Sequence, residues 1–562
     1  MNRKVIFTLL LLVMLFLAVL IAGEIIARLF TSSNPDGQVY FKQKRLLPYR
    51  FPAEMTRYKI DAYREDQEKA YTVDHPLLGW TIGNGRDSEN GLYHSNSQGL
   101  RSSPREYSLQ PHRETLRIAL FGDSFTHGDE EPWFNTWAYF LEQDLRRMGI
   151  RAEVLNFGVG GYGFSQAFLR WKIQGKKYRP DLVVIGFQGE NMKRTVNIFR
   201  SLYSERTWLV FSKPRFIITP EGLKTVNCPV IPPEEVADYL ANLDREPLAR
   251  YEFWYNPDNY RAPFWTASRL GQLIYNLDRQ GKRDRRSYSE MENQGGTPEE
   301  VTLAIIRSWA KDVRREKGIP IIVHLPRKGD RKLIAAGQKP AYYSLLEDLE
   351  RDGIPVVDPA GKMKDRRGLY RRSHYSTKGN RIIAETLAEW IGETVREQGW
   401  TERFRCEPAA RDDETLLARV EPDGTLDLDL GRPGDELFIR GGFHERELYQ
   451  NRISARWTSG TARIRLPLSP PAGDRGVLEV DLAAAGPGDS RLEASLDGTG
   501  LVALEGGELR HRYRLPRLER AEVSDLILGT RAWNPAEVGN PGDGRRLGVM
   551  IDRIRVRAAP SP

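Results

Sequence analysis

Residues 116–128 read LRIALFGDSFTHG, and this stretch decides how the central part of the chain should fold. Its first six residues form a short apolar run with one charge, which is typical of a strand buried in a parallel sheet. Glycine, aspartate and serine follow at once, so the chain is expected to turn sharply where the strand ends. The stretch therefore predicts a buried strand with Ser124 exposed at its carboxyl end.

Similar apolar runs occur before and after residue 250, and helical stretches lie between them. Four further strands are expected at 152–157, 181–187, 319–325 and 354–357. The helices between them are marked by apolar stripes and by a capping box that begins at Thr297. Strands that alternate with helices indicate a parallel, doubly wound α/β sheet, here of five strands over residues 111–400.

Two other parts of the chain depart from the α/β pattern. Residues 192–297 are rich in aromatic residues, show little periodicity and are expected to be an insertion. In residues 401–562, eight segments alternate apolar and polar residues between Gly, Pro and Asp turns, which predicts an all-β sandwich. These segments are TLDLDLG, DELFIRG, ARIRLPL, GVLEVDL, RLEASLDG, HRYRLP, SDLILGT and GVMIDRIRV.

The N-terminus predicts a membrane anchor. Residues 5–23 carry no charge and are long enough to cross an apolar bilayer core of about 30 Å. A cleaved signal peptide is the alternative, but its apolar part is usually shorter and ends at a small-residue cleavage site. Arg3 and Lys4 favour a cytoplasmic N-terminus, although basic residues from Arg28 onward weaken that preference. We expect residues 1–23 to be the anchor, 24–110 to be a polar lead-in, and the rest to lie outside the cytoplasm, in the periplasm or at the cell surface.

Composition excludes several other functions. The net charge of +8 comes from 84 basic and 76 acidic residues that are scattered along the chain, so no nucleic-acid partner is expected. The two cysteines, Cys228 and Cys406, are far apart and have no metal-like spacing, so neither a metal site nor a disulfide framework is expected. The sequence does not indicate an oligomeric state.

Chemistry is expected at one edge of the predicted sheet, because ligands of open parallel sheets bind beyond the carboxyl ends of the strands. Ser124, the loop NFGVGGYGFSQ, the loop QGEN and His374 all follow strands there. A serine, a histidine and hydrogen-bond donors suffice for acyl transfer. Gly158-x-Gly160-x-x-Gly163 also matches a dinucleotide fingerprint, but Asp181 stands at the wrong end of its strand to complete it. We therefore expect no cofactor.

A family resemblance supports this interpretation. GDSFTHG, NFGVGGYG, an asparagine after the third strand and HYSTKGN occur in the order of the four blocks of the SGNH/GDSL hydrolase superfamily. The segments HPLLGW and HSNSQGLRS also resemble the lead-in of bacterial extracytoplasmic members. The resemblance implies a flavodoxin-like three-layer fold over about residues 115–397, with Ser124 as nucleophile and His374 as base. It also implies an oxyanion hole of the N–H groups of Ser124 and Gly161 and the amide of Asn191.

Departures from the family pattern leave alternatives open. Gly189-Glu190-Asn191 replaces the usual Gly-Asn pair, and we expect Asn191 to be the donor. His127, close to Ser124 in sequence, is interpreted as a packing or substrate-contact residue, and Asp123 as a substrate contact. The family also places an aspartate two or three residues before its histidine, where this chain has arginines.

Three interpretations remain for the group behind His374. Asp358 ends the last strand, although it is also a good helix cap before Pro359, and Asp365 lies in the loop that follows. The third interpretation is a backbone carbonyl that fixes the tautomer of a Ser–His dyad, and it is the one we favour.

The extra segments suggest a carbohydrate substrate, because aromatic faces commonly bind sugars. Candidates are Trp254 in the insertion and Phe443, Trp457 and Trp533 in the sandwich, with core packing as the alternative for each. The sequence thus predicts a membrane-anchored esterase that removes O-acyl groups, most simply O-acetyl, from a carbohydrate. The alternatives are an O-acetyltransferase of an exported polysaccharide and a non-catalytic glycan-binding protein with a degenerate fold.

Overall fold

A computed structural model covers the 562-residue chain. It describes residues 3–406 except 90–91, 103–104, 205, 262 and 280–294. From residue 407 onward it describes the chain except 407–415, 417–418, 422–423, 433–434, 436–437, 450–452, 469–475, 485–491, 507–508, 517–521, 536–546 and 559–562.

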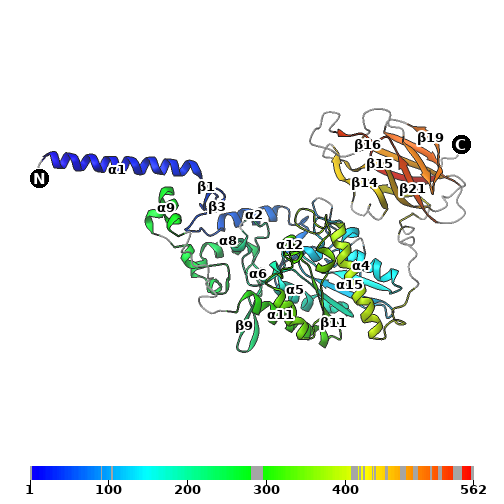
Figure 1. Ribbon diagram of the computed structural model, residues 1–562, viewed down its shortest axis with the longest axis horizontal. Coiled ribbons are helices and arrows are strands. Elements are labelled where there is room, and N and C mark those ends of the chain that lie inside the picture. The colour runs from blue at the N-terminus through cyan, green and yellow to red at the C-terminus, as the bar shows by residue number, and fades with distance from the viewer. Residues whose placement is uncertain are drawn as a thin grey trace.

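The α/β domain is built on a five-stranded parallel sheet, as the sequence predicts (Figure 1). Its spatial order is β12-β11-β8-β6-β7, with every neighbouring pair parallel. Numbered along the chain this is the order 2-1-3-4-5, which is the flavodoxin-like arrangement. The strands are β6 (Leu116–Phe121), β7 (Ala152–Asn156), β8 (Leu182–Phe187), β11 (Ile319–His324) and β12 (Val356–Val357).

Helices cover both faces of this sheet and make three layers. Alternate residues of β6 serve the two faces: Leu116, Ile118 and Leu120 join one apolar core, whereas Ala119 and Phe121 join the other. The first core includes residues of α4 (Trp137–Arg147) and α15 (Thr377–Glu397). The second includes α5 (Phe164–Ile173), α11 (Pro298–Arg315) and α13 (Tyr343–Arg351). Burial on both faces explains why the strands read as continuous apolar runs.

The lead-in and the insertion pack together beside this domain. The lead-in forms a three-stranded sheet, a hairpin and one helix: β1 (Thr31–Ser33), β2 (Val39–Phe41), β3 (Lys44–Arg45), α2 (Ala53–Glu65), β4 (Thr72–His75) and β5 (Gly79–Ile82). The insertion forms α7 (Arg200–Tyr203), β9 (Arg215–Thr219), β10 (Gly222–Val226), α8 (Pro233–Ala241) and α9 (Arg269–Arg279), with 3-10 turns between α8 and α9. Residues of α2, α7 and α8 share one apolar cluster, so the insertion has a small core.

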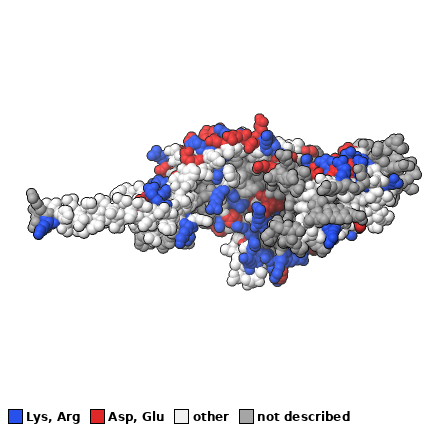
Figure 2. All heavy atoms as spheres, turned by 90° about the horizontal axis from the view of Figure 1, so that it is seen from above, with Lys and Arg blue, Asp and Glu red and all other residues white. Residues whose placement is uncertain are grey.

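The N-terminal helix α1 (Arg3–Phe30) leaves this body as a long rod (Figures 1 and 2). Its span from Lys4 to Phe30 has a mean hydropathy of 3.3, and none of its most apolar window is buried. Figure 2 shows Lys and Arg at the tip of the rod and where it joins the rest of the molecule, with an uncharged stretch between. By length and composition the helix is able to span a membrane, either as an anchor or as a signal sequence.

The described residues of the C-terminal part form an antiparallel β-sandwich of ten strands; the sequence predicts such a sandwich. The strands are β13 (Leu426–Asp429), β14 (Ile439–Tyr449), β15 (Ile453–Leu468), β16 (Gly476–Ala484), β17 (Glu493–Leu496), β18 (Thr499–Gly500), β19 (Val502–Gly506), β20 (Arg510–Arg514), β21 (Glu522–Gly529) and β22 (Met550–Ala558). The long strand β15 pairs with β14, β21 and β22, so its hydrogen bonds link most of the sandwich. Each of the eight alternating sequence segments contains or overlaps one of these strands.

Candidate active site

Ser124 opens a four-residue helix, α3 (Ser124–His127), directly after β6. Gly122 makes the turn with φ +155°, and a Cβ there would lie 2.2 Å from Thr126 Oγ1. Asp123 Oδ1 accepts the Phe125 N–H at 2.9 Å and caps the helix, and Asp123 Oδ2 pairs with Arg194 at 2.9 Å. Asp123 is fully buried, so it positions the serine turn and is not the substrate contact that the sequence suggested.

His374 lies across the sheet edge from Ser124, as the sequence predicts. Its Nε2 is 2.8 Å from Ser124 Oγ, within hydrogen-bond distance. The imidazole packs against the Phe125 ring, with a centroid separation of 4.9 Å. Ser376 caps the following helix α15 and so fixes where the histidine loop ends. The two groups needed for nucleophilic attack are therefore in contact although 250 positions apart in sequence.

The acceptor behind His374 is Glu130, which the sequence analysis missed. Glu130 Oε1 is 3.0 Å from His374 Nδ1, and the carboxylate also accepts the backbone N–H groups of Arg372 and Ser373. Burial raises the pKa of Glu130, but the hydrogen bonds from His374 and Ser373 outweigh burial and hold that pKa below its usual value. The structure thus contains a Ser–His–Glu chain, so the predicted carbonyl-supported dyad is wrong.

The two arginines that replace the expected acid have partners of their own. Arg371 Nε donates to Glu131 Oε1 at 2.6 Å, and Glu131 is fully buried. Arg372 contributes its backbone N–H to Glu130. The acid is thus supplied from just after the serine block, and the residues before the histidine hold that acidic pair in place. An acidic pair six residues after Ser124 was the available sequence signal.

Neither of the acids proposed from the sequence lies behind His374. Asp358 Oδ1 is 2.7 Å from Nδ1 of a different histidine, His324, and also caps the Ala360 N–H. Tyr342 joins His324 Nε2 at 2.9 Å and packs against Gly189, where a Cβ would lie 2.4 Å from the tyrosine ring. Asp358 therefore supports the loop before Asn191 through His324 and Tyr342. Asp365 is exposed.

Three hydrogen-bond donors suit an oxyanion hole: the Ser124 N–H, the Gly161 N–H and Asn191 Nδ2. None of them hydrogen-bonds to any residue that the structure describes. The loop containing Gly161 packs against the serine helix, because a Cβ on Gly158 would lie 2.4 Å from the His127 nitrogen. Unpaired donors near a nucleophile are what a developing oxyanion requires.

Gly161 has the conformation that this role needs. Its φ is +81°, and a Cβ would lie 2.5 Å from Leu209 Cδ1. The indole N–H of Trp80 donates to the Gly160 carbonyl at 2.9 Å. Because N–H and C=O point in opposite directions in a trans peptide, this bond turns the Gly161 N–H away from Trp80. Trp80, in the lead-in, is thus a positioning residue that the sequence analysis did not single out.

The side chains of Asn191 and Glu190 have different partners, and this difference suits an oxyanion hole. Asn191 Oδ1 accepts from Arg194 Nη1 at 3.1 Å, which leaves the amide nitrogen as the outward donor. Glu190 Oε2 pairs with Arg327 at 2.8 Å. Both residues begin α6 (Glu190–Thr195), and the carboxylate is neutralised by arginine. The structure supports Asn191 over Glu190 as the donor.

His127 forms a second, buried histidine–acid pair. Its Nδ1 is 2.5 Å from Asp129 Oδ1 and its Nε2 is 2.8 Å from the Tyr71 hydroxyl. Burial lowers the pKa of His127, although Asp129 opposes that shift. With 2 % of its surface exposed, His127 is a packing residue, which was one of the two expected interpretations.

The predicted aromatic contacts have different outcomes. Trp254 donates to the Lys193 carbonyl on α6 at 3.1 Å, which places it beside the helix that carries Asn191. Its role as a substrate contact stays a prediction. Trp457 is 9 % exposed and packs edge to face on Trp533, 5.6 Å between centroids. The buried Trp457 therefore fits the core-packing alternative and not the predicted sugar-binding role.

The strand order and the order of the four blocks along one sheet edge agree with the expected arrangement. The α/β domain has the flavodoxin-like three-layer fold that the resemblance to SGNH hydrolases implies. No family model and no curated protein matches the chain. Solved structures similar to it include a putative lipolytic G-D-S-L protein from Desulfitobacterium hafniense, with 14% identity over 49% of this chain and 98% of that one and a TM-score of 0.26.

Two other similar structures are esterases. An acetyl xylan esterase is 12% identical over 49% of this chain and 99% of its own, with a TM-score of 0.26. A two-domain esterase active on acetylated mannans is 11% identical over 80% of this chain and 92% of its own, with a TM-score of 0.24.

Proposed function

We propose that this protein is a membrane-anchored serine esterase that removes O-acyl groups, most simply O-acetyl, from a carbohydrate. The observation that carries the proposal is the hydrogen-bonded chain from Ser124 through His374 to Glu130. These three side chains supply a nucleophile, a base and the acceptor that fixes the base's tautomer. Such a chain activates a hydroxyl group for attack on an ester carbonyl.

The reaction proceeds in two displacements. Ser124 Oγ attacks the carbonyl carbon while His374 Nε2 takes its proton, and the oxyanion binds the Ser124 and Gly161 N–H groups and Asn191 Nδ2. His374 then gives the proton to the leaving alcohol oxygen as the ester C–O bond breaks, which leaves an acyl-serine. Water attacks the acyl carbon as His374 takes its proton; the bond from Ser124 Oγ to the acyl carbon then breaks, His374 returns the proton to Oγ, and the carboxylic acid leaves. Glu130 stabilises the imidazolium in both halves.

The two sequence features that favoured a non-catalytic protein both have partners in the structure. Those were the arginines before His374 and the carboxylate of Glu190. Arg371 neutralises Glu131, and Arg327 neutralises Glu190, so neither feature disables the site. The degenerate-fold interpretation therefore has no remaining support from these residues.

The carbohydrate part of the proposal rests on the exposed aromatic residues of the insertion. Trp208 has 69 % of its surface exposed, and the next residue, Leu209, packs against Gly161. An open indole face one residue from the oxyanion loop suits a sugar ring. The anchor is proposed from the length and hydropathy of α1, and the body would lie on the far side of the membrane.

The test uses the full chain in detergent with an activated acetyl ester, alongside labelling by a serine-directed phosphonate. We expect turnover and labelling, both lost in Ser124→Ala. A folded wild-type chain that neither turns over nor labels would overturn the enzyme proposal. Faster transfer of the acetyl group to an added oligosaccharide than to water would replace the esterase by an acetyltransferase.

The proposed anchor is tested separately by membrane fractionation. The full chain should stay with membranes through carbonate extraction, and a chain lacking residues 1–30 should be released. Recovery of a mature protein that begins after residue 23 would instead identify a cleaved signal sequence.

A further inference from the structure

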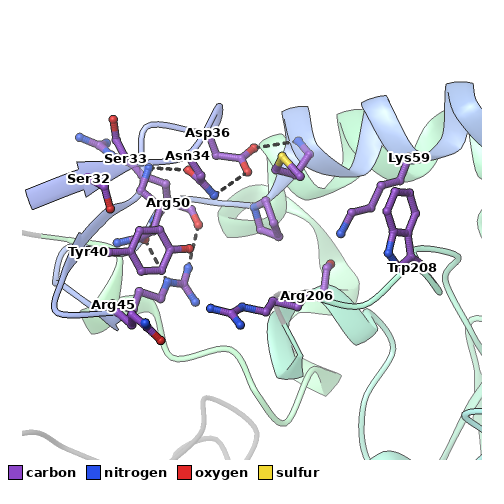
Figure 3. A pocket seen from close by; sticks show the side chains of 15 residues that line it. Ser32, Ser33, Asn34, Asp36, Tyr40, Arg45, Arg50, Lys59, Arg206 and Trp208 are labelled. Carbon is purple, nitrogen blue, oxygen red and sulfur yellow. Dashed lines mark hydrogen bonds between the residues drawn. The ribbon is translucent and has the colours of Figure 1, made fainter. Parts of the chain in front are cut away.

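A pocket of about 580 Å³ lies at the foot of α1 (Figure 3). The chain enters it directly from the helix, because β1 follows α1 and Thr31 Oγ1 donates to the Ala27 carbonyl at 2.7 Å. Its walls come from the β1–β3 sheet, from α2 and from the loop around Trp208. None of the residues that line the pocket belongs to the Ser124–His374–Glu130 chain or to its oxyanion donors, and the pocket is closest in sequence to the proposed membrane span.

The pocket is strongly basic. Four cationic side chains line it against one acid, Asp36; the cations are Arg45, Arg50, Lys59 and Arg206. The oxygens of Asp36 are occupied, since Oδ1 caps α2 by accepting the N–H of Glu54 at 2.7 Å and Oδ2 accepts the amide of Asn34 at 3.3 Å. The unbalanced charge predicts an anionic ligand.

Two of these cations have guanidinium groups that are available to a ligand. Among the described residues, no ion pair or hydrogen bond engages the guanidinium groups of Arg50 and Arg206. Figure 3 shows Arg206 extending toward the side of the pocket that Arg45 occupies. Guanidinium groups that face one cavity suit the oxygens of a phosphate group.

The other two cations are fixed before any ligand binds. Arg45 donates to Gln38 Oε1 and to the Arg50 carbonyl, each at 2.9 Å. Lys59 is 7 % exposed and donates to the Thr207 carbonyl at 2.6 Å, beside the Trp208 ring. Because these groups are already ordered, binding an anion would cost little additional side-chain entropy.

The exposed apolar stripe of α9 indicates that the bilayer surface passes beside this pocket. Leu270, Ile274 and Leu277 form one stripe at i, i+4 and i+7, and Ile274 and Leu277 have 51 % and 75 % of their surfaces exposed. The stripe begins against α1, where a Cβ on Gly23 would lie 2.8 Å from Leu270 Cδ2. An amphipathic helix that packs against the end of a membrane span fits the headgroup boundary.

The same helix is tied to the pocket. Asn276 of α9 accepts the Leu47 N–H and donates to the Leu47 carbonyl, each at 2.9 Å. Leu47 follows Arg45 by two residues, so α9 holds the basic hairpin close to its own apolar stripe. A ligand in this pocket would therefore have its charged part among arginines and its apolar part in the bilayer.

We propose that this pocket binds the phosphate headgroup of an anionic phospholipid from the membrane leaflet that faces the domain. The inference rests on the proposed membrane anchor but not on the esterase activity. Lipid binding would hold the body at a fixed orientation on the bilayer, with α9 in the headgroup boundary and the Ser124 site outside it.

The test compares two double variants of the full chain by native mass spectrometry from detergent micelles. The probes are dioleoyl phosphatidylglycerol and dioleoyl phosphatidylcholine. The pocket variant is Arg50→Gln/Arg206→Gln. The matched control, Lys42→Gln/Lys44→Gln, removes the same charge from exposed positions of the neighbouring β2–β3 segment that do not line the pocket.

We expect wild type and control to retain one phosphatidylglycerol in preference to phosphatidylcholine. The pocket variant should bind it roughly 25-fold more weakly, at about 5-fold for each of the two charges. Equal weakening in both variants would overturn the proposal in favour of diffuse surface attraction. Displacement of the lipid by millimolar inorganic phosphate would overturn the lipid assignment. Unchanged hydrolysis of the soluble ester in both variants would show that they fold and would keep this outcome separate from the esterase test.

Discussion

Glu130 shows how one residue completes the site from an unexpected place. Its φ of +69° is uncommon for a residue other than glycine and costs free energy. Glu130 and Glu131 nevertheless serve different partners, because the first carboxylate meets His374 and the second meets Arg371. Each carboxylate is neutralised by a cationic or protonatable group, so neighbouring negative charges are tolerated.

The clearest residue-level prediction concerns the acid. Glu130→Gln should lower kcat for the activated ester by roughly 10²- to 10⁴-fold, because an amide favours the wrong imidazole tautomer and stabilises the imidazolium poorly. KM should change little. Asp365→Asn, which alters an exposed carboxylate in the loop before His374, serves as the control and should retain wild-type kcat. Equal rates for both variants would contradict a Ser–His–Glu triad.

A second prediction at this scale compares the two neighbouring arginines. Arg371→Met leaves the buried Glu131 carboxylate without its cation and should lower the free energy of unfolding by roughly 3 kcal/mol. Arg372→Met should change it by less than about 0.5 kcal/mol, because the part of Arg372 that matters is its backbone N–H. Urea unfolding curves of the two variants provide the measurement. Similar midpoints would contradict the role given to Arg371.

At the scale of elements, the loop after β7 is held from two sides. The lead-in supplies Trp80, which binds the Gly160 carbonyl, and the insertion supplies Arg200, which donates to the Gly161 carbonyl at 3.2 Å. The oxyanion loop of the α/β domain is therefore positioned by segments that lie outside the domain's own βα units. This arrangement explains why both segments are packed together beside the catalytic edge.

The paired glycines of this loop give a matched experiment. Gly161→Ala should lower kcat by at least 10-fold, because alanine disfavours φ +81° and its Cβ would lie 2.5 Å from Leu209. Gly160→Ala should be tolerated, since the nearest atom to its Cβ would be Asp129 Oδ2 at 3.7 Å. The kinetic constants for the activated ester report both effects. If Gly160→Ala is the more damaging change, the loop geometry described here is incorrect.

At the scale of the whole molecule, buried charge between the lead-in and the insertion limits stability. Lys213 is 1 % exposed, and a Cβ on Gly79 of the lead-in would lie 3.1 Å from its Cα. Burial lowers the pKa of Lys213 to about 7, well below the value of about 10.5 for a solvated lysine. Below about pH 7 the folded chain therefore carries the full cost of burying this ammonium group, and at neutral pH it still carries most of that cost.

The pH dependence of that cost is testable. Between pH 7 and about 10.5 the unfolded chain binds a proton that the folded chain has lost, so wild-type stability gains from rising pH through Lys213. Lys213→Met should therefore raise Tm by several degrees at pH 7, and the difference should shrink toward pH 10. Differential scanning calorimetry of both proteins over this range provides the measurement. A Tm difference that does not vary with pH would contradict the buried-charge explanation.

Much of the fold follows from local patterns along the chain. Apolar runs such as 116–121 and 182–187 specify strands buried on both faces, and alternating segments after residue 400 specify a sheet with one buried face, because side-chain period reports burial. The same patterns placed Ser124 and His374 at one edge, since parallel strands end together. Gly161 and Asn191 were found by their order in the chain.

Only the tertiary structure decided the remaining features of the site. The identity of the acid depends on how the chain after Ser124 turns at Glu130, and carboxylates in several loops satisfied the sequence pattern equally well. Trp457 was misjudged because a packed and an open indole have the same sequence signature. The basic pocket combines residues 36–59 with the loop at 206–208, which no local pattern connects. The sequence determined the secondary structure of each segment and the candidate side chains that it carries. The distances between those side chains, on which catalysis depends, were decided by tertiary packing.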